Sequence, residues 1–391
     1  METIHTLFKI GHGPSSSHTM GPENACKDFL SRYQGKRHRV ILFGSLSNTG
    51  KGHLTDTIVQ SLLPDCNVIF SNEKTEHPNT MDIIAFKNQN EIGRERYISI
   101  GGGSIRRIGD KPNKKDHVYP HETFFEMMRF CKKKNMSLHD YVYHFEEKNI
   151  KDHLKACWEI MKKAIDSGLN QEGFLPGVLK VRRKAKAIYN NHDTHVDSKL
   201  RLISAYAYAV GEVNASGKKV VTAPTCGASG VLPAVLYYLY DQEKYSEPDI
   251  IDAMATAGII GNVVRANGSI SGAEAGCQAE VGTACSMAAA AYADLKTNDL
   301  AIIDYAAEIA LEHHLGLTCD PVEGYVQIPC IERNAVGAHR AINAGELAQF
   351  LPSTQMISFD TVVDAMLDTG RDLHDAYRET SGGGLAKKFK K

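Results

Sequence analysis

From about residue 120 to its end, the chain is a succession of alanine-rich segments in which apolar residues recur with the period of an α-helix. Runs with the length and β-branched content of a strand are almost absent from this part of the chain. The pattern predicts an all-helical region whose alanine content lets the helices pack closely. Helices are expected over 150–167, 197–213, 229–242, 248–264, 284–296, 299–314, 331–348 and 358–376.

The first 115 residues follow a different pattern, which predicts a mixed α/β region. Strands are expected at 39–43, 81–86 and 96–100, and helices at 22–33 and 53–63. The charged, turn-rich segment 105–119 is expected to link the two regions. The predicted fold class is therefore α+β, with a small α/β domain over 1–115 and a large all-helical catalytic domain over 120–391.

Charge and hydropathy narrow the classes of partner. The formal net charge is −1, which gives no support to the binding of nucleic acid or of an anionic membrane surface. No stretch reaches the roughly 18 uninterrupted apolar residues of a membrane helix, and the N-terminal segment lacks the layout of a signal peptide. We expect a cytoplasmic protein that acts on a small molecule.

The nine cysteines are not expected to form disulfides, because the cytosol keeps thiols reduced. Five of them lie between residues 226 and 330, beside glycine-rich turns. Cys319 and Cys330 are separated by a segment with two prolines, which must form a loop that could bring both sulfurs together. Cys330 and Cys277 each precede a helical segment, where the helix dipole favours a thiolate. Spacing alone leaves two interpretations open: buried structural cysteines, or ligands of a metal or an iron–sulfur cluster.

The stretch "ILFGSLSNTGKGH" at 41–53 begins like a phosphate-binding loop. In that loop four residues separate two glycines, and a hydroxyl residue follows the lysine. Here five residues separate Gly44 from Gly50, and Gly52 stands in place of the hydroxyl residue. The stretch is therefore not predicted to bind a nucleotide, and its polar turn needs another explanation.

The chain resembles the iron–sulfur-dependent L-serine dehydratases (L-serine ammonia-lyases), specifically their bacterial single-chain form. The resemblance covers nearly the whole length and rests on "KIGHGPSSSHTMGP", "GSLSNTGKGHLTD", "SIGGG", "EGFLPG", "TAPTCGASGVLPAVL", "SISGAEAGCQAEVGTACSMAAA", "GLTCDPVEGYVQIPCIERNA" and "YRETSGGGLA". It implies that Cys277, Cys319 and Cys330 hold three irons of a [4Fe-4S] cluster whose fourth iron is open to substrate. The implied reaction removes water from L-serine and gives pyruvate and ammonia. An L-cysteine desulfidase with a related cluster is the alternative, and a homodimer is expected.

The resemblance also implies roles for polar residues. His53 is the expected catalytic base, since a histidine is largely neutral at cytosolic pH; without the resemblance, a role in capping or packing the following helix would be preferred. Lys51 and Thr225 complete the expected catalytic set, and Thr222 is expected to line the same cavity as Thr225. The residues expected to bind substrate are Ser15, Ser16, Ser17, His18, Thr19, Thr55, His77, Asn79 and Ser99.

The serine cluster at 15–19 precedes a helix, where hydroxyls and backbone amides suit a carboxylate. A helix cap would need only one serine. Three departures from the family pattern stand out. The chain is shorter between His53 and His77, which puts a regulatory serine site there in doubt. Cys226 stands where many relatives have asparagine, and Lys391 stands where relatives end in a cysteine. Cys285 is expected in the core.

Overall fold

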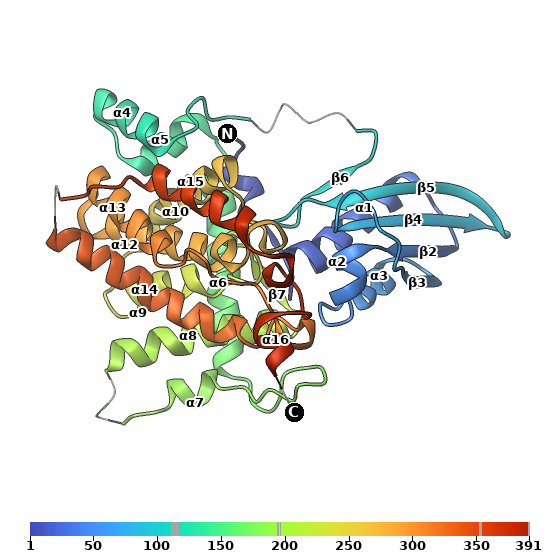
Figure 1. The fold of residues 1–391 in the computed structure, drawn as a ribbon. Coiled ribbons are helices and arrows are strands. Elements are labelled where there is room, and N and C mark those ends of the chain that lie inside the picture. The colour runs from blue at the N-terminus through green and yellow to red at the C-terminus, as the bar shows by residue number, and fades with distance from the viewer. Residues whose placement is uncertain (111–116, 194, 196, 352–353, 390–391) are drawn as a thin grey trace.

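The computed structural model describes residues 1–391 except 111–116, 194, 196, 352–353 and 390–391. Figure 1 shows a large helical body with a smaller sheet region projecting from one side. This arrangement confirms the predicted α+β fold class. None of the helices in the described residues has the length and hydropathy of a membrane span.

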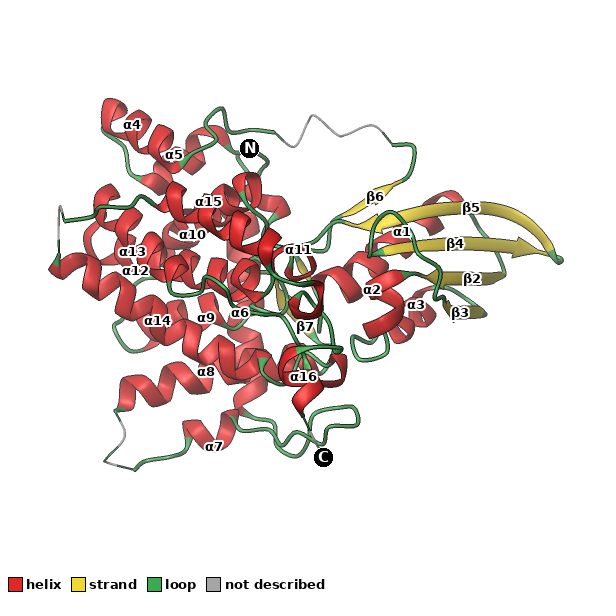
Figure 2. Ribbon diagram, viewed as in Figure 1, coloured by secondary structure: helices red, strands yellow, loops and turns green. Residues whose placement is uncertain are grey.

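The helical body contains every helix expected beyond residue 150, together with several short ones (Figure 2). The helices are α4 (Phe124–Lys134), α5 (Leu138–Phe145), α6 (Ile150–Leu169), α7 (Ala185–Tyr189), α8 (Ser198–Ala215), α9 (Val231–Asp241), α10 (Glu247–Asn267), α11 (Gly272–Ala275), α12 (Thr283–Thr297), α13 (Leu300–Glu312), α14 (Cys330–Phe350), α15 (Phe359–Asp372) and α16 (Gly384–Lys388). Helices α4, α5 and α10 begin with a capping box, in which a serine or threonine and an acidic residue satisfy the first free N–H groups.

Alanine content explains the packing of the body around α12. The alanines at 288–291 are fully buried, and α12 packs against α9, α10, α13 and α14. A Cβ atom on Gly345 of α14 would lie 2.5 Å from Tyr292 of α12, so the two helices approach more closely than a larger side chain would permit. The prediction of close helix packing is confirmed.

The sheet region has five strands in the order β3-β2-β4-β5-β6. They are β2 (Arg37–Leu42), β3 (Cys66–Phe70), β4 (Thr80–Lys87), β5 (Asn90–Ser99) and β6 (Ile105–Arg107); β2 and β3 are parallel and the other pairs antiparallel. Buried and exposed residues alternate along β2, and the buried face packs against α1 (Gly21–Arg32) and α3 (Thr55–Leu62). The short helix α2 (Gly44–Thr49) follows β2.

The three expected strands and both expected helices of this region are present. Strands β3 and β6 were not predicted. Strand β6 lies within the segment expected to be a linker, and its residues pair with β5. The linker expectation is therefore wrong for 105–107, and residues 111–116 lie outside the described part of the chain.

The first dozen residues pack with the helical body. Ile4, Leu7 and Phe8 are buried in its hydrophobic core. Strand β1 (Ile10–His12) pairs with β7 (Lys219–Val221), which precedes α9. The Thr222 hydroxyl donates to the Leu7 carbonyl oxygen at 2.6 Å and accepts from the Lys9 N–H at 2.9 Å. Thr222 thus anchors the N-terminal segment rather than facing a cavity. The division into domains at 1–115 and 120–391 stays a prediction.

Candidate active site

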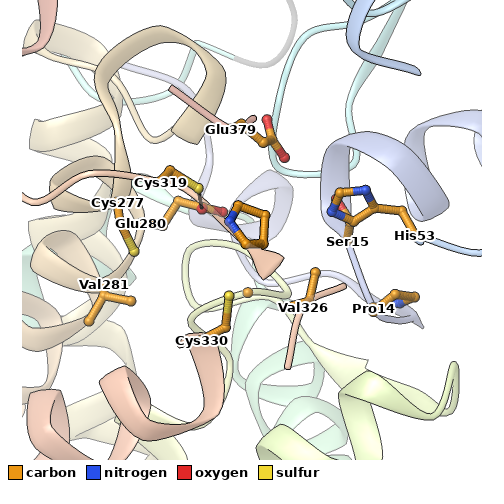
Figure 3. A pocket seen from close by; sticks show the side chains of 12 residues that line it. Pro14, Ser15, His53, Cys277, Glu280, Val281, Cys319, Val326, Cys330 and Glu379 are labelled. Atoms are coloured by element: carbon orange, nitrogen blue, oxygen red, sulfur yellow. Dashed lines mark hydrogen bonds between the residues drawn. The ribbon is translucent and has the colours of Figure 1, made fainter. Parts of the chain in front are cut away.

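A pocket lies where the helical body meets the turns of the sheet region (Figure 3). Its walls combine residues that are far apart in the chain and that include three cysteines, two glutamates and a histidine. The lining residues are Pro14, Ser15, His53, Gly227, Cys277, Glu280, Val281, Cys319, Pro321, Val326, Cys330 and Glu379.

The three candidate ligand cysteines come from three different elements. Cys277 follows α11, Cys319 lies in the loop after α13, and Cys330 is the first residue of α14. Cys277 and Cys319 are buried, whereas Cys330 is half-buried. The Cys319 thiol donates to Glu280 Oε2 at 3.7 Å. The neighbouring Cys319 lowers the pKa of Cys277, and Cys277, together with burial, raises the pKa of Cys319 well above its usual range. The structure thus brings together the three cysteines that the sequence singled out.

Cys330 differs from the expectation for a thiol at a helix start. Burial raises the pKa of the Cys330 thiol, and nearby Cys277 acts in the same direction. The Arg333 guanidinium acts in the opposite direction but does not compensate. The loss of hydration therefore outweighs the neighbouring groups that favour the thiolate at this position.

Two glycines allow the close approaches that the pocket needs. A Cβ atom on Gly52 would lie 2.8 Å from the Gly324 carbonyl oxygen, so the glycine-rich turn packs backbone to backbone against the loop between two candidate ligands. A Cβ atom on Gly272 would lie 2.8 Å from Glu280 Oε2 and 3.2 Å from Cys319 Sγ. A larger residue at either position would displace a wall of the pocket.

His53 stands in the turn between α2 and α3 and is buried. Its Nδ1–H donates to the Thr49 carbonyl oxygen at 3.0 Å, which leaves Nε2 as the unprotonated ring nitrogen. Burial holds the pKa of His53 well below 6.5, and the His18 ring, whose centroid is 4.5 Å away, acts in the same direction. The imidazole is therefore neutral and basic at Nε2.

The serine cluster folds into a π-helical turn over Ser16–Met20, before α1. Its side chains form a buried chain of hydrogen bonds. Ser15 Oγ lies 3.2 Å from Ser17 Oγ, and Ser17 Oγ lies 2.7 Å from His18 Nδ1. His18 Nε2 lies 2.9 Å from Ser45 Oγ, and burial lowers the pKa of His18 to about 4. Ser15 lines the pocket; Ser16 is buried in the same turn.

Of three other predicted site residues, Thr19 and Thr55 form hydrogen bonds to backbone carbonyls and Lys51 lies at the surface. The Thr19 hydroxyl donates to the His53 carbonyl oxygen at 2.7 Å, and the Thr55 hydroxyl donates to the His18 carbonyl oxygen at 2.6 Å. These two bonds fasten the two polar turns to each other. Lys51 is exposed, with its Nζ 5.5 Å from the centre of the Phe70 ring, and does not line the pocket.

The remaining predicted residues, His77, Asn79, Ser99 and Thr225, are not among the residues that line the pocket. His77 Nδ1 accepts from the Asn79 N–H at 3.0 Å. Asn79 Oδ1, Ser99 Oγ and Thr225 Oγ1 are buried polar atoms without a hydrogen-bond partner of good geometry among the described residues. Thr225 lies beside the Glu280 carboxyl. Such atoms retain hydrogen-bonding capacity for a ligand or water.

Sequence reasoning missed two pocket glutamates. Glu280 lies three residues after Cys277, and Glu379 lies in the C-terminal segment before α16. Glu379 is buried and Glu280 is half-buried. The loss of hydration raises the pKa of each to about 7; for Glu280, the Glu379 carboxyl adds to the effect. A signal was present, because Glu280 is a charged residue in an otherwise small and apolar run beside a candidate ligand.

Two further cysteines and the chain end complete the predicted set. Cys285 is buried in α12, where its thiol donates to the Gly337 carbonyl oxygen at 3.2 Å, which confirms its core assignment. Cys226 is also in the core and does not line the pocket. Lys391 lies outside the described residues.

Two family models match the chain. Residues 66–386 match the model described as Serine dehydratase alpha chain, and residues 3–63 match the model described as Serine dehydratase beta chain.

Several characterised proteins are similar over the whole chain. L-serine dehydratase TdcG of Escherichia coli K12 is 40% identical over an alignment of 449 positions, with 99% of both chains covered. L-serine dehydratase of Haemophilus influenzae is 38% identical, with 100% of this chain and 99% of the relative covered. L-serine dehydratase of Helicobacter pylori 26695 is 39% identical, with 99% of both covered. The alignments are longer than the 391 residues of this chain, so the chain lacks segments that its relatives carry.

Proposed function

The chain belongs to the serine dehydratase family and is a lyase, and from this premise we propose that it removes water from L-serine in the pocket of Figure 3, with a [4Fe-4S] cluster as cofactor. The products are pyruvate and ammonia. The observation that carries the proposal is the convergence of three cysteines and a neutral, buried histidine on one pocket.

The donor set fits an iron–sulfur cluster. Three thiol groups from separate elements surround the pocket, and cysteine thiolates are the usual ligands of such clusters. Among the described residues, no three side chains of the metal-binding types converge as a single ion requires. A four-iron cluster instead takes each thiolate at a different iron. Gly272 keeps the space beside Cys319 free of a side chain.

Cys277, Cys319 and Cys330 would hold the cluster. With three thiolates and one open iron, the bound cluster supplies a Lewis acid for the leaving hydroxyl group. Cys277 and Cys319 lie close enough for each to shift the pKa of the other, which supports the same assignment. We propose that the fourth position stays open to substrate.

His53 Nε2 takes the Cα proton of serine. The His53 Nδ1–H donates a hydrogen bond to the Thr49 carbonyl oxygen, so only Nε2 has a free electron pair to accept a proton. The low pKa of His53 keeps the ring neutral until it accepts the substrate proton. The bond from Thr19 to the His53 carbonyl oxygen holds the turn in position.

The serine turn receives the substrate carboxylate. Ser15 lines the pocket beside His53, and the hydroxyls of the turn are buried and ordered by one another. Ser16, Ser17 and His18 support this surface, and the unpaired polar atoms of Asn79, Ser99 and Thr225 remain proposed substrate contacts. Burial of the turn excludes bulk water, which strengthens each hydrogen bond to a bound anion.

Anaerobic purification tests the proposal. The protein should be brown, with the broad visible absorption of an iron–sulfur cluster, and should form pyruvate from L-serine. Removal of iron with a chelator should abolish both properties together. Colourless, iron-free protein that still forms pyruvate would overturn the cofactor, and brown protein that is inert toward L-serine but forms pyruvate from L-cysteine would overturn the substrate. The expected homodimer and cytoplasmic location stay predictions.

A further inference from the structure

Glu379 is held in the pocket by the chain on both sides of it. The Cys319 N–H donates to the Tyr377 carbonyl oxygen at 2.8 Å, and the Thr380 N–H donates to the Cys319 carbonyl oxygen at 3.2 Å. Between these bonds, Glu379 adopts a left-handed backbone with φ of 48°, which is uncommon for a residue with a side chain. Figure 3 shows its carboxyl group directed between the Cys319 side of the pocket and His53.

Only one of the two Glu379 carboxyl oxygens is used. Oε1 accepts from the Ser17 hydroxyl at 3.1 Å and lies 3.4 Å from His18 Nδ1. Oε2 is buried and has no hydrogen-bond partner among the residues that the structure describes. A buried carboxyl oxygen without a donor is costly, so a donor from a ligand would be strongly favoured at Oε2.

Among the residues that the structure describes, the pocket wall offers this carboxyl group no lysine or arginine. The lining residues instead include two glutamates. Arg333, the cation beside the thiols, interacts with Cys277 and donates to the Thr318 carbonyl oxygen and to Asp320. A wall with this charge pattern is complementary to a cationic group on the substrate.

Glu280 is the weaker candidate for that role because its carboxyl group already has neighbours. Glu280 Oε2 accepts a hydrogen bond from the Cys319 thiol at 3.7 Å, and Thr225 lies beside the carboxyl group. In Glu379, Oε1 is held by a hydrogen bond and Oε2 has no partner among the described residues. A carboxylate oriented in this way can form a charge-assisted hydrogen bond to a ligand.

We infer that Glu379 Oε2 binds the α-ammonium group of the amino-acid substrate and thereby selects amino acids over hydroxy acids that lack it. The inference rests on the proposed function and adds the residue that recognises the amino group. Glu379 and the serine turn then bind the two charged groups on the substrate Cα, and the Ser17 hydroxyl connects the two sites by its bond to Glu379 Oε1.

Glu379→Gln tests the inference, since it removes the charge and preserves the shape. The KM for L-serine should rise roughly 10- to 100-fold, as expected for loss of a charge-assisted bond, with a smaller change in kcat. The inhibition constant of 3-hydroxypropanoate, which is serine without its amino group, should stay unchanged. Glu159→Gln is the matched control, because Glu159 is a surface residue of α6 that pairs with Lys162, and it should change neither constant.

The two possible failures are distinguishable. Equilibrium binding of L-alanine and propanoate to the unmodified holoprotein needs no turnover, and L-alanine should bind more tightly only while Glu379 is present. If L-serine is not turned over but this preference exists and is lost in the variant, the proposed function fails and the ammonium site stands. If KM for L-serine and the inhibition constant of 3-hydroxypropanoate rise together, or neither changes, the inference is overturned. Should Glu379→Gln not fold, Glu379→Asp is the second variant. Aspartate keeps the negative charge on a side chain one methylene shorter, so the preference for L-alanine over propanoate should be weakened less than by Glu379→Gln.

Discussion

At the residue scale, a single backbone carbonyl decides which nitrogen of His53 can act. The Thr49 oxygen occupies Nδ1–H, and burial keeps the ring neutral. His53 therefore presents its basic atom without a carboxylate partner to orient it. The same helical turn that forms the glycine-rich motif also sets the tautomer of its histidine.

His53→Ala should lower kcat for L-serine by roughly two to four powers of ten, the usual range for loss of a general base, while the cluster absorption stays intact. His313→Ala is the matched control, because His313 is exposed at the end of α13, and it should leave the rate unchanged. Loss of cluster absorption in His53→Ala would assign His53 a structural role. An unchanged rate would exclude it as the base and leave His18 or His77.

Replacing Cys277, Cys319 or Cys330 singly by serine should abolish cluster absorption and pyruvate formation together, because in the proposed site each thiolate holds its own iron. Iron content and visible absorption of anaerobically purified protein measure the effect. Cys285→Ala, in which a buried thiol outside the pocket is removed, should retain both properties. A single cysteine variant with full absorption and normal rate would show that its residue is not a ligand.

The sequence predicted the residues whose chemistry is visible in a motif and missed those whose role depends on burial. The cysteines and His53 meet in the pocket as expected. Glu379 was missed because an exposed and a buried glutamate look alike in a sequence, whereas Glu280 was marked only by its small, apolar neighbours. Thr19 and Thr55 were predicted to bind substrate, but their hydroxyls bond to backbone carbonyls that only the folded chain brings near.

At the element scale, the junction of α13 and α15 contains a buried acid. Asp304 of α13 accepts from the N–H of Phe359, the first residue of α15, at 3.2 Å. Burial raises the pKa of Asp304 to about 6. The hydrogen bond satisfies a free N–H group at the start of α15 and favours the ionised carboxylate. Burial disfavours the ionised form and has the larger effect on the pKa.

The difference in free energy of unfolding between Asp304→Asn and the unmodified protein should therefore shift in favour of the variant as pH rises. The folded Asp304 carboxyl binds its proton more tightly than the unfolded one, so ionisation between about pH 4 and pH 6 destabilises the folded state, by up to about 3 kcal/mol. Asparagine does not titrate and can still accept from Phe359. Urea unfolding from pH 4.5 to 7.5 measures the difference, with exposed Asp152→Asn as control. A difference independent of pH would contradict the raised pKa.

Long periodic elements were predictable, and short ones were not. The helices of the body were located because their apolar residues recur over several turns. Strands β1, β6 and β7 have three residues each, too few for an alternating pattern to appear. Strand β3 lies at the edge of the sheet with half-buried and exposed residues, so its sequence carries little hydrophobic signal.

At the scale of the whole molecule, the N-terminal segment ties the sheet region to the helical body. Phe8 is fully buried, and a Cβ atom on Gly258 of α10 would lie 2.9 Å from its ring. Strand β1 follows immediately and pairs with β7. The polypeptide thus begins in the helical core, leaves it to build the sheet, and returns. No local pattern in the sequence indicates this path.

Phe8→Ala should lower the free energy of unfolding by about 3–5 kcal/mol, because it opens a cavity in the core of the helical body. Phe350→Ala, at the exposed end of α14, should have little effect. Circular dichroism of the helices during urea unfolding provides the measurement. Equal stability of the two variants would show that the N-terminal segment does not contribute to that core.

The strand order β3-β2-β4 has a consequence for any divided form of this enzyme. The two matched family regions meet between residues 63 and 66, after α3 and before β3. A break there would leave β2 in one polypeptide and both of its neighbours in the other. Neither fragment could finish folding and then dock through ready-made surfaces, since β2 would have to insert between two strands of its partner. Assembly and folding would occur together, and backbone hydrogen bonds between strands would join the two fragments.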